Sequence, residues 1–143
     1  MTFVVDASVA IKWFVREALH TEALRLLDEP ETLHAPDLLV PEVTNIAWKK
    51  ALRGEIDQNQ ATEIAKAIRQ GVPLLYPSTL FNERALEIAF LLEHPVYDCL
   101  YLACAELIDG VLVTADEALG EAAQRAGFDR FIRHLEEQNR SAP

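Results

Sequence analysis

Short apolar runs alternate along the chain with longer segments in which apolar residues recur every three or four positions. The most informative stretch, YDCLYLACAELIDGVLVTADE, covers residues 97–117. Its first part carries the i, i+3, i+4, i+7 spacing of one helical face, at Leu100, Ala103, Cys104 and Leu107. Gly110 is a suitable stop after a helix, and residues 111–113 form a continuous apolar run that is typical of a strand covered on both faces. This stretch predicts a helix, a tight turn, a buried strand and the start of another helix.

The same alternation extends over the rest of the chain. Further strands are expected at residues 3–5, 32–35, 74–76 and 130–132. Helical patterns cover residues 9–15, 20–29, 37–54, 57–68, 80–92 and 118–127. Because strands that alternate with helices imply βαβ units, we expect an α/β protein with a mainly parallel central sheet flanked by helices. The length of 143 residues allows one domain, expected over residues 1–135, with a polar and frayed tail over residues 136–143.

The composition favours a soluble globular protein, since half of the residues are apolar and a quarter are charged. No apolar run approaches the ~20 residues that a helix needs to span a bilayer. The N-terminal segment also lacks the basic region and the long apolar stretch of a secretory signal. We therefore expect a cytoplasmic protein without a membrane partner.

The net charge of −10 restricts the possible partners. A passive nucleic-acid binder usually carries a basic face, because neutralisation of phosphates supplies much of its affinity. The acidity counts against that class of protein. It is compatible with an enzyme that recruits divalent cations and with a basic protein partner.

Several other chemistries are poorly supported. Cys99 and Cys104 are five positions apart on one predicted helix, so they point in different directions and are expected to be buried free thiols. The four histidines show no paired metal-ligand spacing and there is no CxxC motif, which argues against a zinc site. Motifs for nucleotide phosphates and for a serine nucleophile are absent. Trp13 and Trp48 lie on otherwise apolar helix faces, which favours core packing over base stacking.

Four acids fall at strand ends or helix starts: Asp6, Glu42, Asp98 and Asp116. Asp6 and Asp116 follow the two most apolar strand candidates, and in an open α/β sheet the carboxyl edge of the strands is where ligands bind. If those two strands are neighbours, both acids open into one crevice. Taken singly, each aspartate is equally a good helix N-cap, and Glu42 is suited to the positive end of its helix dipole.

As a set, the four acids favour a metal site. Clustered carboxylates raise one another's pKa unless cations neutralise them, and hard cations such as Mg²⁺ or Mn²⁺ prefer oxygen ligands. Carboxylates that hold one or two such ions are found in many phosphodiester-cleaving sites, where the metal activates water and stabilises the leaving oxygen. Ser8, Asn45 and Thr114 lie two or three residues from an acid and are candidates to orient ligands or waters, although Ser8 and Thr114 are explained as well by turn or cap hydrogen bonds.

Four segments together resemble the PIN-domain proteins, and most closely the VapC toxins of bacterial toxin–antitoxin pairs. These segments are VVDASVAIKWF, APDLLVPEVTNIAWK, YDCLYLACAE and VLVTADEAL, in family order and spacing over nearly the whole domain. The resemblance implies a PIN-like domain with a parallel sheet and a metal-dependent ribonuclease site. It carries the catalytic and Mg²⁺-binding role, for which Mn²⁺ substitutes, onto Asp6, Glu42, Asp98 and Asp116, and a supporting role onto Ser8, Asn45 and Thr114. It also implies an RNA substrate, a homodimer, and a VapB-like antitoxin whose C-terminal segment lies in or near the acidic site.

Three other classes of protein are alternatives. A receiver-like signalling domain also gathers acids and Mg²⁺ at the carboxyl edge of a parallel sheet, but it needs adjacent acids after the first strand and a lysine after the last strand. Here Asp6 stands alone, and no lysine follows Lys66. A phosphatase with a DxD nucleophile is disfavoured because Ser8 occupies the place of the second acid. The third reading is a silent interaction module whose acids only cap helices.

Overall fold

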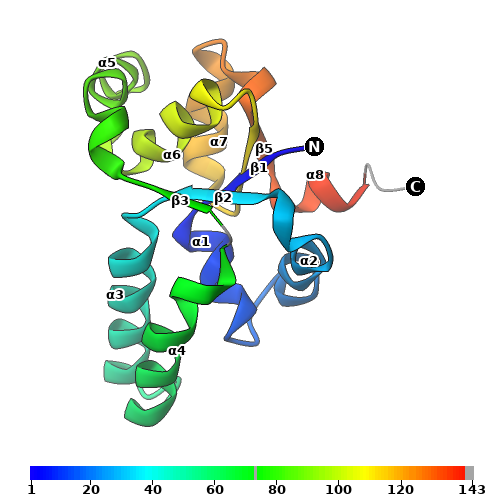
Figure 1. Ribbon diagram of the computed structural model, residues 1–143, viewed down its shortest axis with the longest axis vertical. Coiled ribbons are helices and arrows are strands. Elements are labelled where there is room, and N and C mark those ends of the chain that lie inside the picture. The colour runs from blue at the N-terminus through cyan, green and yellow to red at the C-terminus, as the bar shows by residue number, and fades with distance from the viewer. Residues whose placement is uncertain (73, 141–143) are drawn as a thin grey trace.

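The computed structural model describes residues 1–72 and 74–140, and its centre is a five-stranded sheet in which every strand pair is parallel (Figure 1). The strand order is β3-β2-β1-β4-β5, so β1 lies in the middle. The strands are β1 Phe3–Val5, β2 Leu33–Pro36, β3 Leu74–Tyr76, β4 Val111–Thr114 and β5 Ile132–His134. The predicted α/β fold with a parallel sheet is confirmed.

Helices cover both faces of this sheet. Figure 1 shows α1, α2, α3 and α4 on one side and α5, α6 and α7 on the other. This division follows from right-handed crossovers, because the chain moves outward from β1 to β3 and then returns to β4 and β5. The α-helices are α1 Ala7–Ala10, α2 His20–Arg25, α3 Leu39–Leu52, α4 Gln58–Gly71, α5 Asn82–Leu92, α6 Val96–Leu107, α7 Glu117–Arg125 and α8 Leu135–Arg140.

Short 3-10 turns account for most differences from the predicted elements. They continue or precede helices at Ile11–Trp13, Leu26–Asp28 and Ser78–Phe81, so α2 and α5 are shorter than their apolar patterns. The last strand was expected at residues 130–132 but begins at Ile132, because Asp129–Phe131 form another 3-10 turn closed by Phe131 N–H donating to Phe128 O at 2.8 Å. The expected strand at residues 32–35 is observed one residue later.

The core lies on both sides of β1 and β4. Val4, Val5, Leu112 and Val113 are fully buried, and α6 packs against β1, β2 and β4. Every α6 residue from 99 to 105 is buried, which explains why this helix is apolar on all sides. No single helix in the described ranges is long and apolar enough to cross a bilayer; only Ser78–Leu92 and Val96–Leu107 together, bent by 114°, reach that length and composition.

The two cysteines are buried free thiols, as expected. Burial raises the pKa of Cys99 to about 11 and that of Cys104 to about 12, so both thiols are protonated at neutral pH. Neither is placed to act as a nucleophile.

The interpretation of the tryptophans is half wrong. Trp13 is buried, and its Nε1–H donates to Ala23 O at 3.0 Å. Trp48, however, is 55% exposed. The buried stripe of α3 consists of Leu39, Val43 and Ala47, and a residue directly after Ala47 lies about 100° further round the helix. Trp48 therefore projects into a surface groove between α3 and α4 instead of into the core.

The C-terminal helix α8 packs on β4, β5 and α2, and its first residue, Leu135, is fully buried. Residues 136–140 continue the helix, and residues 141–143 lie outside the described part. The boundary between a domain over residues 1–135 and a tail over residues 136–143 stays a prediction.

Candidate active site

The two central strands bring two of the predicted acids to one edge of the sheet. Val5 pairs with Val113 in the parallel register of β1 and β4, so Asp6 and Thr114 follow side by side. Thr114 Oγ1 donates to Asp6 Oδ2 at 2.5 Å. Asp116 lies two residues further, and its backbone N–H donates to Thr114 Oγ1 at 3.0 Å. The expected common position of Asp6 and Asp116 at the carboxyl edge is therefore observed.

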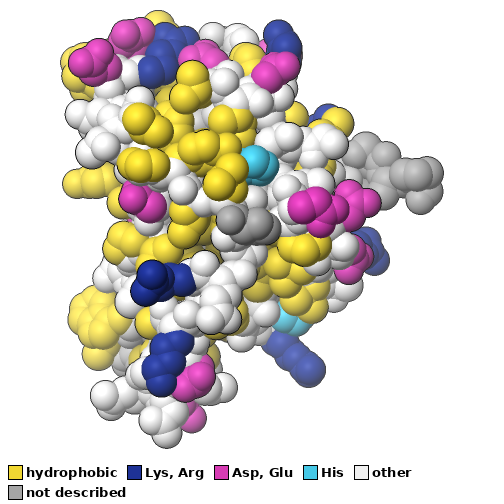
Figure 2. Space-filling model, in the orientation of Figure 1, with side chains coloured by type: hydrophobic (Ala, Val, Ile, Leu, Met, Phe, Trp, Pro, Cys, Tyr) yellow, Lys and Arg dark blue, Asp and Glu magenta, His cyan; other side chains and the backbone are white. Residues whose placement is uncertain are grey.

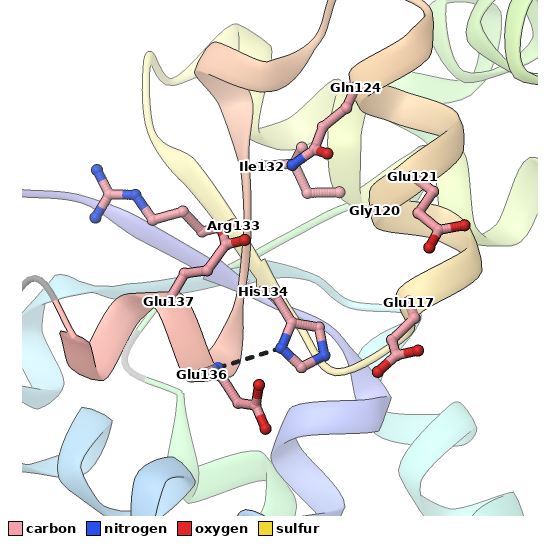
Figure 3. Close-up of a pocket in the computed structure, with 9 residues that line it drawn as sticks. All are labelled: Glu117, Gly120, Glu121, Gln124, Ile132, Arg133, His134, Glu136 and Glu137. Atoms are coloured by element: carbon pink, nitrogen blue, oxygen red, sulfur yellow. Dashed lines mark hydrogen bonds between the residues drawn. The ribbon is translucent and has the colours of Figure 1, made fainter.

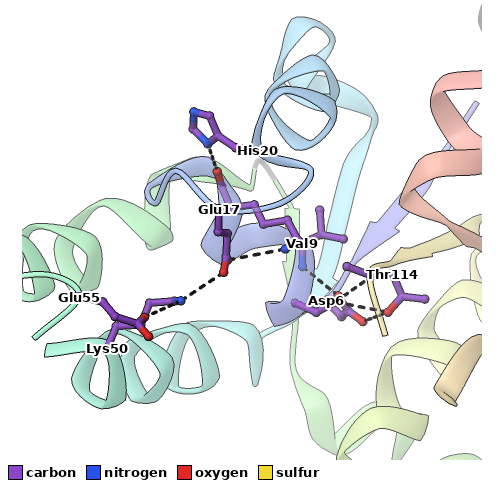
Figure 4. A network of polar contacts seen from close by, with 10 residues as sticks. Asp6, Val9, Glu17, His20, Lys50, Glu55 and Thr114 are labelled. Atoms are coloured by element: carbon purple, nitrogen blue, oxygen red, sulfur yellow. Dashed lines mark hydrogen bonds and ion pairs between the residues drawn. The ribbon is translucent and has the colours of Figure 1, made fainter. Parts of the chain in front are cut away.

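Asp6 is both a helix cap and a buried acid. Its Oδ1 accepts from Val9 N–H at 3.2 Å and from Ser8 Oγ at 2.6 Å, at the start of α1 (Figure 4). The residue is only 6% exposed. Burial raises the pKa of Asp6 to about 6, against the opposing effect of the hydrogen bonds from Ser8, Thr114 and Val9, and the charge of Asp98 adds to the rise.

Asp116 is also a cap, whereas Asp98 is not. Asp116 Oδ1 accepts from Leu119 N–H at 3.1 Å at the start of α7. Asp98 lies within the first turn of α6, whose N-cap position is Pro95. The cap explanation is thus right for Asp6 and Asp116 and wrong for Asp98. A cap bond from the backbone to Asp116 Oδ1 leaves its second carboxylate oxygen for a ligand.

Asp98 is half-buried and forms the centre of a cluster with His94 and Asp116. A hydrogen bond of 2.8 Å joins His94 Nε2 to Asp98 Oδ2. Burial raises the pKa of Asp98, the hydrogen bond and charge of His94 lower it, and the charge of Asp116 raises it. His94, Asp98 and Asp116 each offer one ligand atom, and these atoms lie within 4.8 Å of one another.

Glu42 lies on α3, on the opposite face of the sheet from α6 (Figure 1). Its charge interactions with Asp6 and Asp98, and that between Asp98 and Asp116, link the four acids into one acid cluster. Tyr101 Oη donates a short hydrogen bond to Glu42 Oε1. Burial raises the pKa of Glu42; the Tyr101 bond lowers it, and the charges of Asp98 and Asp6 raise it further. Burial, together with the adjacent Glu42 carboxylate, also raises the pKa of Tyr101, so this hydroxyl stays protonated and remains a donor.

The electrostatics of these residues fit a hard divalent cation. Asp6, Glu42 and Asp98 all have raised pKa values because burial and neighbouring acids both disfavour their charged forms. A bound cation would remove that penalty. The carboxylate oxygens are donors suited to Mg²⁺ or Mn²⁺, and His94 Nε2, which is hydrogen-bonded to Asp98, is placed to orient that acid.

His94 and Tyr101, which hydrogen-bond to Asp98 and Glu42, belong to no recognisable sequence motif. The only available signal is helical spacing, since His94 lies four residues before Asp98 and Tyr101 three residues after it. A search for paired zinc-binding histidines misses His94, because its single imidazole contacts an acid and has no histidine partner. Of the predicted supporting residues, Ser8 and Thr114 both donate hydrogen bonds to the carboxylate of Asp6.

Asn45, the third predicted supporting residue, lies apart from the hydrogen-bonded cluster. It is exposed on α3, one turn beyond Glu42, and lines a groove beside that acid. No hydrogen bond joins it to an acid within the described residues.

A separate cavity of about 300 Å³ lies at the β5 edge of the sheet (Figure 3). None of the four predicted acids lines it among the described residues, although Glu117 follows Asp116 directly. Its lining contains four glutamates, Glu117, Glu121, Glu136 and Glu137, together with Arg133 and His134.

The Tyr101 hydroxyl yields a testable prediction. In Tyr101→Phe, Glu42 loses a donor that favours its charged form, so its pKa rises further. A hydrogen bond to a charged group contributes about 1.5–3 kcal/mol, which corresponds to about one to two pH units. We expect the acid limb of the pH–rate profile for RNA cleavage to move to higher pH by that amount. The rate should return to that of the wild type at alkaline pH. Tyr76→Phe, which removes a hydroxyl bonded to His34 Nδ1 at 2.9 Å, is the matched control and should leave the profile unchanged. An unshifted profile in Tyr101→Phe would show that the hydroxyl does not tune Glu42.

The comparisons with known proteins agree with this geometry. The family model described as PIN domain matches residues 3–124. Ribonuclease VapC3 of Pyrobaculum aerophilum is 33% identical over 123 residues, covering 85% of this chain and 94% of that protein. Ribonuclease VapC1 of Mycobacterium tuberculosis is 31% identical over 121 residues, covering 83% of this chain and 89% of that protein.

Two crystal structures share the fold. One is PAE2754 from Pyrobaculum aerophilum, with a TM-score of 0.72 and 23% identity over 96% of this chain and 92% of that one. The other is Mycobacterium tuberculosis VapC20, described as a toxin that cleaves the sarcin–ricin loop, with a TM-score of 0.67 and 18% identity over 85% of this chain and 95% of that one.

Proposed function

Because the chain belongs to the PIN-domain family and its relatives are VapC ribonucleases, we propose that it is a metal-dependent endoribonuclease acting as the toxin of a VapBC-type pair. The observation that carries the proposal is the group of buried and half-buried acids at the carboxyl edge of β1 and β4. Asp6, Glu42, Asp98 and Asp116 would together hold Mg²⁺, for which Mn²⁺ would substitute.

The chain's own residues would prepare this site before the RNA binds. Thr114 and Ser8 fix the carboxylate of Asp6, and the Leu119 N–H fixes that of Asp116. Tyr101 orients Glu42, and His94 orients Asp98. When bound, the metal supplies an activated water and neutralises the charge that develops on the phosphodiester. Since each acid already has a hydrogen-bonded orientation, little side-chain entropy remains to be lost on metal binding.

The proposed partners suit the charge and surface of the chain. A VapB-like antitoxin that presents arginine or lysine to the acid cluster would form charge-assisted hydrogen bonds with it. A homodimer would cover apolar side chains that are exposed on α5 and at the end of α6, at Leu86, Phe90, Leu91 and Leu107. Figure 2 shows apolar side chains gathered over the part of the surface where Figure 1 places these two helices.

The receiver-like alternative does not fit the fold. Flavodoxin-like receivers have the strand order 2-1-3-4-5, whereas this sheet has the order 3-2-1-4-5. A silent interaction module remains the competing explanation, and metal dependence separates it from a nuclease.

The test of the proposal is metal removal. Protein freed of any co-purified partner should cleave a mixed RNA pool in Mg²⁺ or Mn²⁺. Cleavage should stop when EDTA is added, because the four carboxylates have no catalytic function without a cation. Readdition of metal should restore cleavage, and metal should raise the melting temperature by binding only the folded state. Absence of both cleavage and metal binding would leave the interaction module as the better description.

A further inference from the structure

A groove of about 370 Å³ adjoins the acid cluster on the far side of Glu42. It lies between the solvent-facing stripe of α3 and the beginning of α6, and its lining includes Glu42, Asn45, Ile46, Lys49 and Tyr97. Its volume falls within the ~300–1,000 Å³ of small-ligand sites. Because Glu42 belongs to both the groove and the acid cluster, a polymer bound in the groove would extend directly to the acids.

The aromatic side chain of the groove is Tyr97. It is 64% exposed at the first turn of α6, directly before Asp98. An aromatic ring held on a helix next to a phosphodiester-cleaving cluster offers a stacking surface for an unpaired base. Ile46 adds an apolar, partly buried contact to the same wall.

Lys49 supplies the positive charge of the groove. It lies seven residues after Glu42 on α3, which is roughly 10 Å along the helix axis. Its neighbour Lys50 is already paired, at 3.2 Å from Glu17 Oε2 and 3.1 Å from Glu55 Oε2. Lys49 has no such ion pair within residues 1–72 and 74–140. It is therefore available to a phosphate, in a chain whose net charge of −10 otherwise repels RNA.

We propose that this groove is a subsite for one unpaired ribonucleotide next to the scissile phosphodiester. The base stacks on Tyr97 and a neighbouring phosphate contacts Lys49. The exposed Asn45, four residues before Lys49 on α3, forms a hydrogen bond with the base or the ribose. The inference rests on the proposed ribonuclease function. The unpaired Lys49 favours an RNA phosphate over the basic segment of the proposed antitoxin, which it would repel, and continuity with Glu42 brings the bound RNA to the acids.

Cleavage kinetics on a labelled single-stranded RNA test the subsite. Tyr97→Ala should raise KM roughly 5- to 150-fold, the range for loss of one base–aromatic stack, while kcat changes less than about threefold. Tyr97→Phe keeps the ring and should retain the wild-type KM. Lys49→Gln should raise KM and reduce the slope of log KM against log salt by about one. Lys66→Gln, an exposed lysine of α4, is the matched charge control and should alter neither.

Equilibrium binding separates this inference from the proposed function. The same RNA is titrated by fluorescence anisotropy into Asp98→Asn protein in Mg²⁺, with and without Tyr97→Ala. Weaker RNA binding by the double variant than by Asp98→Asn alone supports the subsite. If the wild-type protein cleaves no RNA but this difference in binding is found, only the nuclease proposal fails. Wild-type cleavage with KM and binding within twofold in Tyr97→Ala would overturn the subsite. A Tyr97→Ala protein that loses its dimer but keeps its KM would identify the groove as a contact between copies and would also overturn it.

Discussion

Asp98→Asn is expected to lower the rate of RNA cleavage more than about 100-fold, because loss of residues that only support a metal ligand already costs about 10- to 100-fold. Asp98 is the acid whose charge raises the pKa of both Asp6 and Glu42, and its oxygen lies within 4.8 Å of ligand atoms from His94 and Asp116. Asparagine keeps the shape and the possible hydrogen bond to His94 but removes the negative charge. The fold should remain intact because Asp98 does not cap α6.

The matched control is Asp129→Asn, an exposed aspartate that precedes β5 at the amino edge of the sheet. It should cleave RNA at the wild-type rate. Circular dichroism and the melting temperature would be recorded for both variants. Full activity in Asp98→Asn would remove this residue from the proposed machinery, and an unfolded Asp98→Asn protein would assign it a structural role instead.

The second large effect concerns stability without metal. Burial raises the pKa of Asp6 from 3.8 to about 6, so its neutral form is favoured in the folded state. Between these two pKa values the unfolded chain has lost the proton and the folded chain retains it. The contribution of Asp6 to stability is therefore fully present below pH 3.8, is lost as the pH rises towards 6, and stays lost above it. Two pKa units correspond to about 3 kcal/mol.

Asp6→Asn should consequently be more stable than the wild type by on the order of 3 kcal/mol at pH 7 in EDTA, and the difference should vanish near pH 4. Urea unfolding at several pH values measures this difference directly. Asparagine retains an acceptor for the Val9 N–H, so the α1 cap persists. Mg²⁺ should raise the stability of the wild type and leave Asp6→Asn nearly unaffected. A stability difference that is independent of pH would mean that the charge of the buried Asp6 carboxylate does not destabilise the wild type.

Much of this site was predictable because three of its acids are marked by local sequence. Asp6 and Asp116 each follow a short apolar run and precede a helical pattern, so a strand end and a cap could both be expected there. Asp98 is found from the same helical stripe that locates α6. The parallel register of β1 and β4 then places Asp6 beside Thr114 without any further information.

The rest depends on packing that no local pattern encodes. Trp48 looks like a core residue from its neighbours, but the orientation of α3 is set by Leu39, Val43 and Ala47 against the sheet. The bond between Tyr101 and Glu42 joins residues 59 positions apart. The groove beside Glu42 exists only because the start of α6 lies next to α3, and it reveals Tyr97 and Lys49 as candidates that their own sequence neighbourhoods do not mark.

The central position of β1 also has a consequence for synthesis on the ribosome. Asp6 is translated early, but β4, which carries Thr114 and leads to Asp116, begins only at Val111. At about 5–20 residues per second, roughly 5–20 s pass between the two strands. During that interval β1 can pair with β2 but has an open edge where β4 will lie, and the nascent chain holds an incomplete set of acids. A growing polypeptide of this kind would lack the complete set of proposed metal ligands until Asp116 has been made, and a message broken before that codon would yield no RNA cleavage.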